Sequence, residues 1–138
     1  MPASTAPKLK ACARQLLAFE LASGKSAGAE DFAAFRICEK LRGPLGKLLG
    51  LGGFRALLSR ALALAGTEFP WLGKLFIKDD ASLEGFAALQ AELDSDAITA
   101  GGVALVAQFL GLLVTFIGPA LTLGFLREVW PTIDDLNF

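Results

Sequence analysis

The chain has 138 residues, of which 54% are hydrophobic and 20% charged, and its formal net charge is −1. This length suits one domain with a sizeable core, and the composition is too apolar for a disordered chain. The chain contains no histidine, which removes the usual general base at neutral pH and the commonest metal ligand.

The first part of the chain predicts two amphipathic helices, at residues 8–22 and 30–41. Residues three or four positions apart form one apolar face of the first helix: Leu9, Cys12, Leu16 and Phe19. Glu20 stands alone among apolar neighbours, and we expect it at the surface. Gly43 and Pro44 are expected to end the second helix, because proline lacks the N–H that a helix interior needs.

The middle of the chain is less regular. The glycine-rich residues 44–53 predict a short helical turn and then a loop, whereas 53–66 keep the spacing of an amphipathic helix. An extended piece is expected at 75–78. Asp80 or Ser82 is expected to cap the helix that follows, since both side chains accept hydrogen bonds from backbone N–H groups.

The C-terminal third contains thirty successive residues without a charge, at 97–126. Pro119 is expected to divide this run into one helix at 97–117 and another at 119–129. Asp94 or Asp96 is expected to cap the first of them.

These elements predict one all-α domain over residues 1–138, a compact bundle of five to seven helices around 97–117 and 119–129. Residues 1–7 and 131–138 are expected to be flexible tails. The two cysteines are expected to be small buried thiols in a reducing cytoplasm, with a disulfide between Cys12 and Cys38 as the alternative.

The apolar run at 97–126 is also long enough to span a membrane. Two observations favour a buried core helix: no Lys or Arg lies between Lys78 and Arg127 to fix an orientation, and the preceding helices have apolar faces that need a partner. We therefore expect a cytoplasmic protein. The alternative is an inner-membrane anchor at 97–126 with the basic N-terminal half facing the cytoplasm.

Small or polar residues recur along the apolar run with alternating spacings of three and four, which predicts a seam for close pairing with another helix. They are Gly101, Ala104, Gln108, Gly111, Thr115, Gly118 and Thr122.

Positive charge is concentrated in the N-terminal half of the chain. Residues 1–78 carry 12 Lys/Arg and 5 Asp/Glu, whereas residues 79–138 carry 1 and 9. Six cations in one part of the chain form a candidate patch for an anionic partner: Arg36, Lys40, Arg42, Lys47, Arg55 and Arg60. The alternative is a solvated face that pairs with the acidic C-terminal half. An isoelectric point near 5.4 argues against a nucleic-acid partner.

Three segments together resemble a family of small uncharacterised bacterial all-helical proteins: EKLRGPL, GFRALLSRALALA and LVAQFLGLLVTFIGPALTLGFLREVWP. The resemblance covers about residues 39–131. It implies a bacterial origin and a recurring domain, and it carries no known activity and no functional residue.

No catalytic constellation is evident, since the acidic residues Glu92, Asp94 and Asp96 have no nucleophile or imidazole nearby in the sequence. We expect a non-enzymatic scaffold, adaptor or regulatory domain that associates with itself or with another protein, and no cofactor or metal. The membrane-anchored protein is the second hypothesis. A helical bundle that binds lipid or another apolar small molecule is the third.

Overall fold

The computed structural model describes residues 6–23, 32–133 and 136, and it confirms the predicted all-α class. The described helices are α1 (Ala6–Ser23), α2 (Ala33–Glu68), α3 (Phe86–Gln90), α4 (Ser95–Ile117) and α5 (Pro119–Val129). Between α2 and α3 lie a short 3-10 helix, η2 (Pro70–Lys74), and the strands β1 (Phe76–Ile77) and β2 (Leu83–Glu84). These strands pair antiparallel, with Phe76 opposite Glu84 and Ile77 opposite Leu83.

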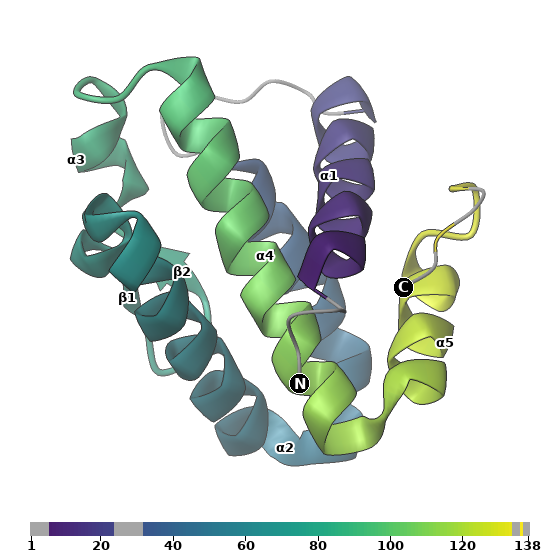
Figure 1. Ribbon diagram of the computed structural model, residues 1–138. Helices are drawn as coiled ribbons and strands as arrows, with labels where there is room; N and C mark the ends of the chain where they lie inside the picture. The colour runs from purple at the N-terminus through teal and green to yellow at the C-terminus, as the bar shows by residue number, and fades with distance from the viewer. Residues whose placement is uncertain (1–5, 24–31, 134–135, 137–138) are drawn as a thin grey trace.

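Helix α4 lies in the middle of the fold, between α1 and the second half of α2, with the first half of α2 behind it (Figure 1). Leu9 lies next to Gly111 and Leu17 next to Gly102, so α1 runs antiparallel to α4. Helix α5 turns back from the end of α4 (Figure 1). The two helices predicted at 97–117 and 119–129 thus occur within two residues of the expected bounds.

The core is built on α4, which buries every residue from 101 to 107 and then Phe109, Leu110 and Leu113. The ring of Phe54 from α2 meets the ring of Phe109 edge to face, with the centroids 5.6 Å apart. Both α2 and α4 are long and apolar enough to span a membrane, and 56% of the most apolar stretch of α4 is buried within the fold, against 33% for α2. Core helices of soluble proteins meet the same criteria of length and composition.

Helix α2 continues through the position where the sequence predicted its end. It contains Pro44 and reaches Gly50 without the loop that was expected at 44–53, so both predictions are wrong. Leu41 and Leu45 are fully buried on either side of the Gly43–Pro44 pair. Their packing on the core outweighs the cost of a proline inside a helix, which is a case of tertiary contacts overriding local propensity.

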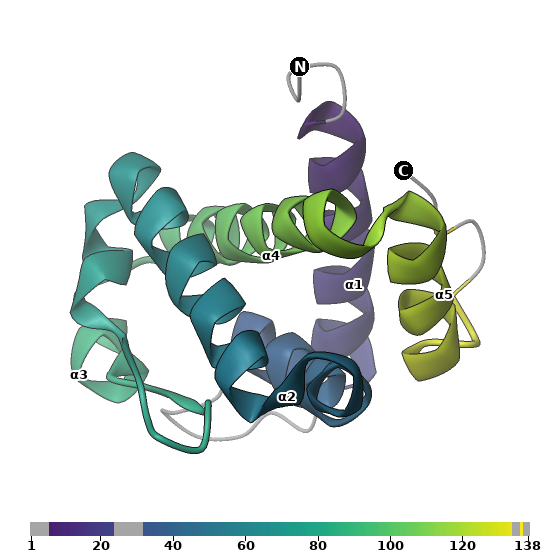
Figure 2. The same cartoon turned by 90° about the horizontal axis from the view of Figure 1, so that it is seen from below.

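Two glycines form sharp corners between helical segments. Gly50 has φ 80° and ψ 158° and divides α2 into two halves, while Gly118 has φ 89° and ψ 158° and separates α4 from α5. This region of backbone conformation is essentially restricted to glycine, because a Cβ atom would clash with the backbone. Both corners lie at the lower end of the molecule in Figure 1, and this end faces the viewer in Figure 2.

The segment between α2 and α4 agrees with the predictions in part. The extended piece expected at 75–78 is present as β1. Asp80 does not cap a helix, because its Oδ1 accepts hydrogen bonds from the N–H and the hydroxyl of Ser82 within the turn before β2. These bonds hold the pKa of Asp80 below its usual value. Asp94 caps α4 as predicted, since its Oδ1 accepts a hydrogen bond of 2.8 Å from the N–H of Ala97.

The predicted tails lie partly outside the described residues. Ala6 and Pro7, which the sequence assigned to the first tail, already belong to α1. Leu136, assigned to the second tail, is buried, and its carbonyl oxygen accepts a hydrogen bond from Arg127. Leu136 is therefore packed against the domain.

Candidate functional site

The stripe of small residues lies along α4, the Gly118 corner and the start of α5. Gly101, Ala104 and Thr122 are buried, Gln108, Gly111 and Gly118 are half-buried, and Thr115 is exposed. The two threonine hydroxyls donate back to their own helices, Thr115 to the carbonyl of Gly111 and Thr122 to the carbonyl of Gly118. Neither hydroxyl is therefore free to donate to a partner helix.

Part of the stripe is covered within the chain itself. A Cβ atom at Gly101 would lie 2.3 Å from Cζ2 of Trp71, and one at Gly111 would lie 3.4 Å from a methyl carbon of Leu9. Glycine at these positions thus lets Trp71 and α1 approach α4 closely. A contact between two copies of the chain through the stripe stays a prediction.

The six cations of the candidate patch lie on both halves of α2, and those with partners contact different parts of the molecule. Arg42 donates to the backbone carbonyl of Asp80 and pairs with Glu39 at 2.8 Å. Arg55 donates to the carbonyls of Ile77 and Lys78, which fastens the β1–β2 hairpin to α2. Lys47 and Arg60 are exposed, and neither has an ion-pair or hydrogen-bond partner among the described residues.

Arg36 and Lys40, the other two cations of the patch, bind the carboxylate of Glu20, which is only 2% exposed. Nε of Arg36 lies 3.3 Å from Oε1, and Nζ of Lys40 lies 2.5 Å from Oε2. The indole N–H of Trp130 donates to the same Oε2 at 2.8 Å. The cluster therefore fastens α1, α2 and the residues after α5 to one buried charge.

The prediction that Glu20 lies at the surface is wrong. Its position, four residues after Leu16, continues the apolar face of α1, and this spacing was the one signal in the sequence for its burial. The aliphatic stem of Lys40 also places its ammonium 5.8 Å from the ring centroid of Phe19 and 5.9 Å from that of Trp130. Because the carboxylate is held by two cations and an indole N–H, it is suited to holding the fold together and poorly suited to acid–base catalysis.

Both cysteines are buried free thiols. Burial raises the pKa of Cys12 to about 11 and that of Cys38 to about 12, where the carboxylate of Glu39 adds to the effect. We expect both thiols to react slowly with Ellman's reagent at pH 8 in the native protein and rapidly in denaturant, because the thiolate is the reacting species. Rapid reaction of either native thiol would contradict this account.

The same shifts predict a loss of stability at alkaline pH. The folded state favours the neutral thiols, so their contribution is complete below the ordinary pKa of 9 and is lost as the pH rises through about 11 for Cys12 and 12 for Cys38. The alkaline fall in the free energy of unfolding, measured by urea titration, should be shallower in a Cys12→Ala, Cys38→Ala double variant. An equal slope in both proteins would contradict the prediction.

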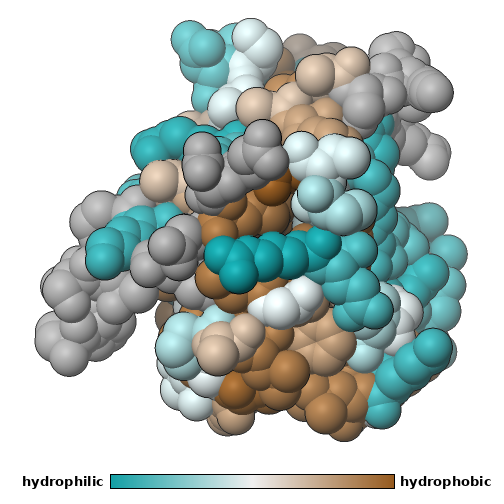
Figure 3. Space-filling view, turned by 90° about the vertical axis from the view of Figure 1, so that its right-hand side faces the viewer, coloured by the Kyte–Doolittle hydropathy of each residue, from teal (hydrophilic) through white to brown (hydrophobic). Residues whose placement is uncertain are grey.

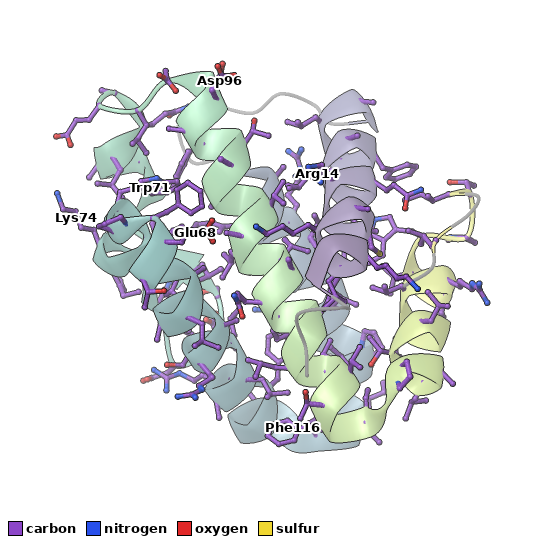
Figure 4. All side chains as sticks on the ribbon, in the orientation of Figure 1. Arg14, Glu68, Trp71, Lys74, Asp96 and Phe116 are labelled. Atoms are coloured by element: carbon purple, nitrogen blue, oxygen red, sulfur yellow. The ribbon has the colours of Figure 1, made fainter. Side chains whose placement is uncertain are left out.

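A surface cleft of about 350 Å³ lies over α4, between α1 and the end of α2. An ion pair of 3.9 Å between Lys10 and Glu68 crosses its lower part, and Arg14 and Asp96 border it above (Figure 4). The cleft is lined by charges of both signs and by Thr99, Ala100, Val103 and Ala104 of α4. None of these side chains forms a pair of nucleophile and base. Within the described part of the chain, no group of three or more Cys, Asp or Glu is placed to hold a metal ion.

The most unusual surface is at the two glycine corners, where large apolar side chains are 46% to 66% exposed. We call this surface the apolar end, and it consists of Leu48, Leu51, Phe116 and Leu121. Leu48 and Leu51 flank Gly50, while Phe116 and Leu121 flank Gly118. Figure 4 shows Phe116 at the lower tip of the molecule. Figure 3, viewed from the α5 side, shows hydrophobic surface at the same lower end as well as higher on that face.

Comparison with known proteins identifies no relative of this chain. No protein-family model, curated protein or solved structure matches the chain. The resemblance of residues 39–131 to a bacterial family therefore stays a prediction, and any function has to be argued from the surfaces described above.

Proposed function

We propose that this chain is a non-enzymatic interaction domain that acts by binding, and that the apolar end is its contact surface. One observation carries the proposal: among the described residues, four of the six exposed large apolar side chains flank the two glycine corners, and the other two, Leu21 and Phe76, lie on separate elements. Exposed apolar surface that is gathered in one place marks interaction sites in soluble proteins, whereas scattered single residues do not.

The chemistry of the remaining groups supports binding over catalysis. The two thiols are buried with raised pKa values, and the buried carboxylate of Glu20 is occupied by Lys40, Arg36 and Trp130. The cleft over α4 offers charges but no activated nucleophile among its lining residues. Association with itself and docking on another surface would both cover the apolar end.

Fractionation of cell extracts tests the proposal. Phe116→Ser removes a side chain that is 66% exposed at the apolar end, and Phe76→Ser removes one that is 54% exposed on β1, away from it. In detergent-free extracts we expect the wild-type chain to be either oligomeric in the supernatant or bound to membranes. Phe116→Ser should release it as a monomer, because the lost apolar area is part of the contact.

The control variant, Phe76→Ser, should behave like the wild type in both respects. Light scattering on the supernatant gives the mass, and immunoblotting of the pellet gives the membrane-bound fraction. A wild-type chain that is already a soluble monomer, with no change in Phe116→Ser, would refute the proposed contact surface.

A second candidate is the C-terminal anchor, with α4 as a membrane span. Its length and composition support this candidate. Within the fold, however, α1 and α2 cover the buried face of α4, so both would have to separate from it before that face could meet lipid. Resistance of the membrane-bound fraction to carbonate extraction would favour the span over the proposal.

A further inference from the structure

We propose that the apolar end docks on the surface of an anionic lipid bilayer, with the two glycine corners inserted among the headgroups. This inference rests on the proposed function and names the partner class of the same surface. It is carried by the shape of the end, by the chemistry of its side chains and by the free cation beside it.

The apolar end is a pair of convex corners. The chain reverses at Gly50 and at Gly118 with nearly the same backbone angles. Both corners lie at the same end of the molecule (Figures 1 and 2). The exposed side chains beside them are leucine and phenylalanine, which have no hydrogen-bonding groups. Such a tip suits the boundary between headgroups and acyl chains, where apolar side chains bury about 5–10 Å deep without needing a complementary partner surface.

The charged residues nearest to the corners along the chain are positive, and one of them is an exposed free cation. Within nine positions of Gly50 or Gly118, the charged residues are Arg42, Lys47, Arg55 and Arg127. Arg55 donates to carbonyls of the β1–β2 hairpin, and Arg127 lies in the last turn of α5, at the end away from Gly118. Lys47 is exposed and free among the described residues. Arg42 alone pairs with a carboxylate, that of Glu39.

The turn between β1 and β2 brings acidic residues to the α2 cations near the Gly50 corner. This turn carries Asp79 and Asp80 next to Lys78, and Arg42 binds the carbonyl of Asp80. The exposed ammonium of Lys47, next to Leu48 of the apolar end, is complementary to anionic headgroups, which attract each nearby Lys or Arg.

The same charges argue against a second copy as the occupant. Two apolar ends packed against each other would bring Lys47 of both copies to the same interface, and no carboxylate pairs with Lys47 among the described residues. Like charges across an interface oppose association. A lipid surface supplies the opposite charge and the apolar layer together.

Flotation of the purified full-length chain with lipid vesicles tests the proposal. One set of vesicles is phosphatidylcholine alone, and in the other about one lipid in three is phosphatidylglycerol. We expect binding to the anionic vesicles to be about tenfold stronger than to the neutral ones, and to weaken as salt is raised. Lys47→Gln should reduce the preference about fivefold, which corresponds to one basic residue near the membrane surface.

Two matched pairs of variants locate the contact. Leu51→Ser and Phe116→Ser should each weaken partition into the anionic vesicles about tenfold, because each removes an apolar side chain that enters the bilayer. Leu21→Ser and Phe76→Ser remove the same residue types at 59% and 54% exposure, from α1 and β1, and should leave partition unchanged.

Each other outcome overturns the proposal in its own way. Equal loss of vesicle binding in Phe116→Ser and Phe76→Ser would show that the apolar end is not the contact. Equal binding to both vesicle types would show that anionic lipid is not the partner. An oligomer that depends on Phe116 but does not bind vesicles overturns the bilayer as partner and leaves the contact surface in place. Absence of both vesicle binding and oligomerisation overturns the proposed function as well.

Discussion

Replacing Glu20 with glutamine is expected to lower the free energy of unfolding by about 3 kcal/mol, the lower end of the range for breaking a buried ion pair. The substitution keeps the size of the side chain and an acceptor for the Trp130 N–H, but removes the charge that Arg36 and Lys40 share. Because these two cations are 27% and 43% exposed, water offsets part of their loss. Urea unfolding followed by circular dichroism at 222 nm measures the change.

Glu39→Gln is the matched control for this prediction. Glu39 is an exposed acid on α2 that pairs with Arg42 one helical turn away, and such pairs contribute about 0.5 kcal/mol or less. Equal effects of the two substitutions would mean that the burial of Glu20 contributes nothing special to the fold.

The second large effect is expected from Gly101→Ala, which should destabilise the protein by about 1–3 kcal/mol, the usual cost of overpacking a core. The new methyl carbon would lie 2.3 Å from Cζ2 of Trp71, well inside van der Waals contact. The indole ring would have to move away from α4, so its fluorescence emission should change together with the stability.

Gly124→Ala is the control for this effect. Gly124 lies inside α5, and a Cβ atom there would have no atom within 4 Å. Alanine should therefore stabilise α5 by up to about 1 kcal/mol through its helix propensity. A shift of both variants in the same direction would contradict the packing that the structure assigns to Gly101 and Trp71.

The C-terminal half of the fold was predictable because its signals are local. The helices over the uncharged run at 97–126, their division at Pro119 and the cap at Asp94 depend on neighbours in sequence, and the structure confirms all three. The path of α2 was not predictable in this way. Gly43 and Pro44 are strong local signals for a helix end, but the buried residues Leu41 and Leu45 keep the segment helical through contacts with distant parts of the chain.

The corner in α2 shows the same limitation. Residues 44–53 contain several glycines, and nothing local distinguishes Gly50 from Gly46 or Gly52 as the one that turns the chain. The apolar end could not be seen in the sequence for this reason, since it exists only once both corners are brought to the same end of the molecule.

The Glu20 cluster was hidden by sequence distance. Trp130, which donates to the carboxylate, lies 110 residues from Glu20, and Arg36 and Lys40 lie 16 and 20 residues away. The predicted basic patch did contain Arg36 and Lys40, but the acid that binds them belongs to the N-terminal half of the chain and not to the acidic C-terminal half. Charge totals per segment do not identify which individual groups meet.

The measurement that tests the proposed contact surface most directly is the emission of an environment-sensitive NBD label attached at position 116. Because Cys12 and Cys38 are buried, a cysteine introduced as Phe116→Cys can be labelled selectively, and Phe76→Cys provides the control site. On self-association or on addition of anionic vesicles, we expect a blue shift and a gain in intensity at position 116 and no change at position 76. A label at position 116 that stays in water under both conditions would contradict it.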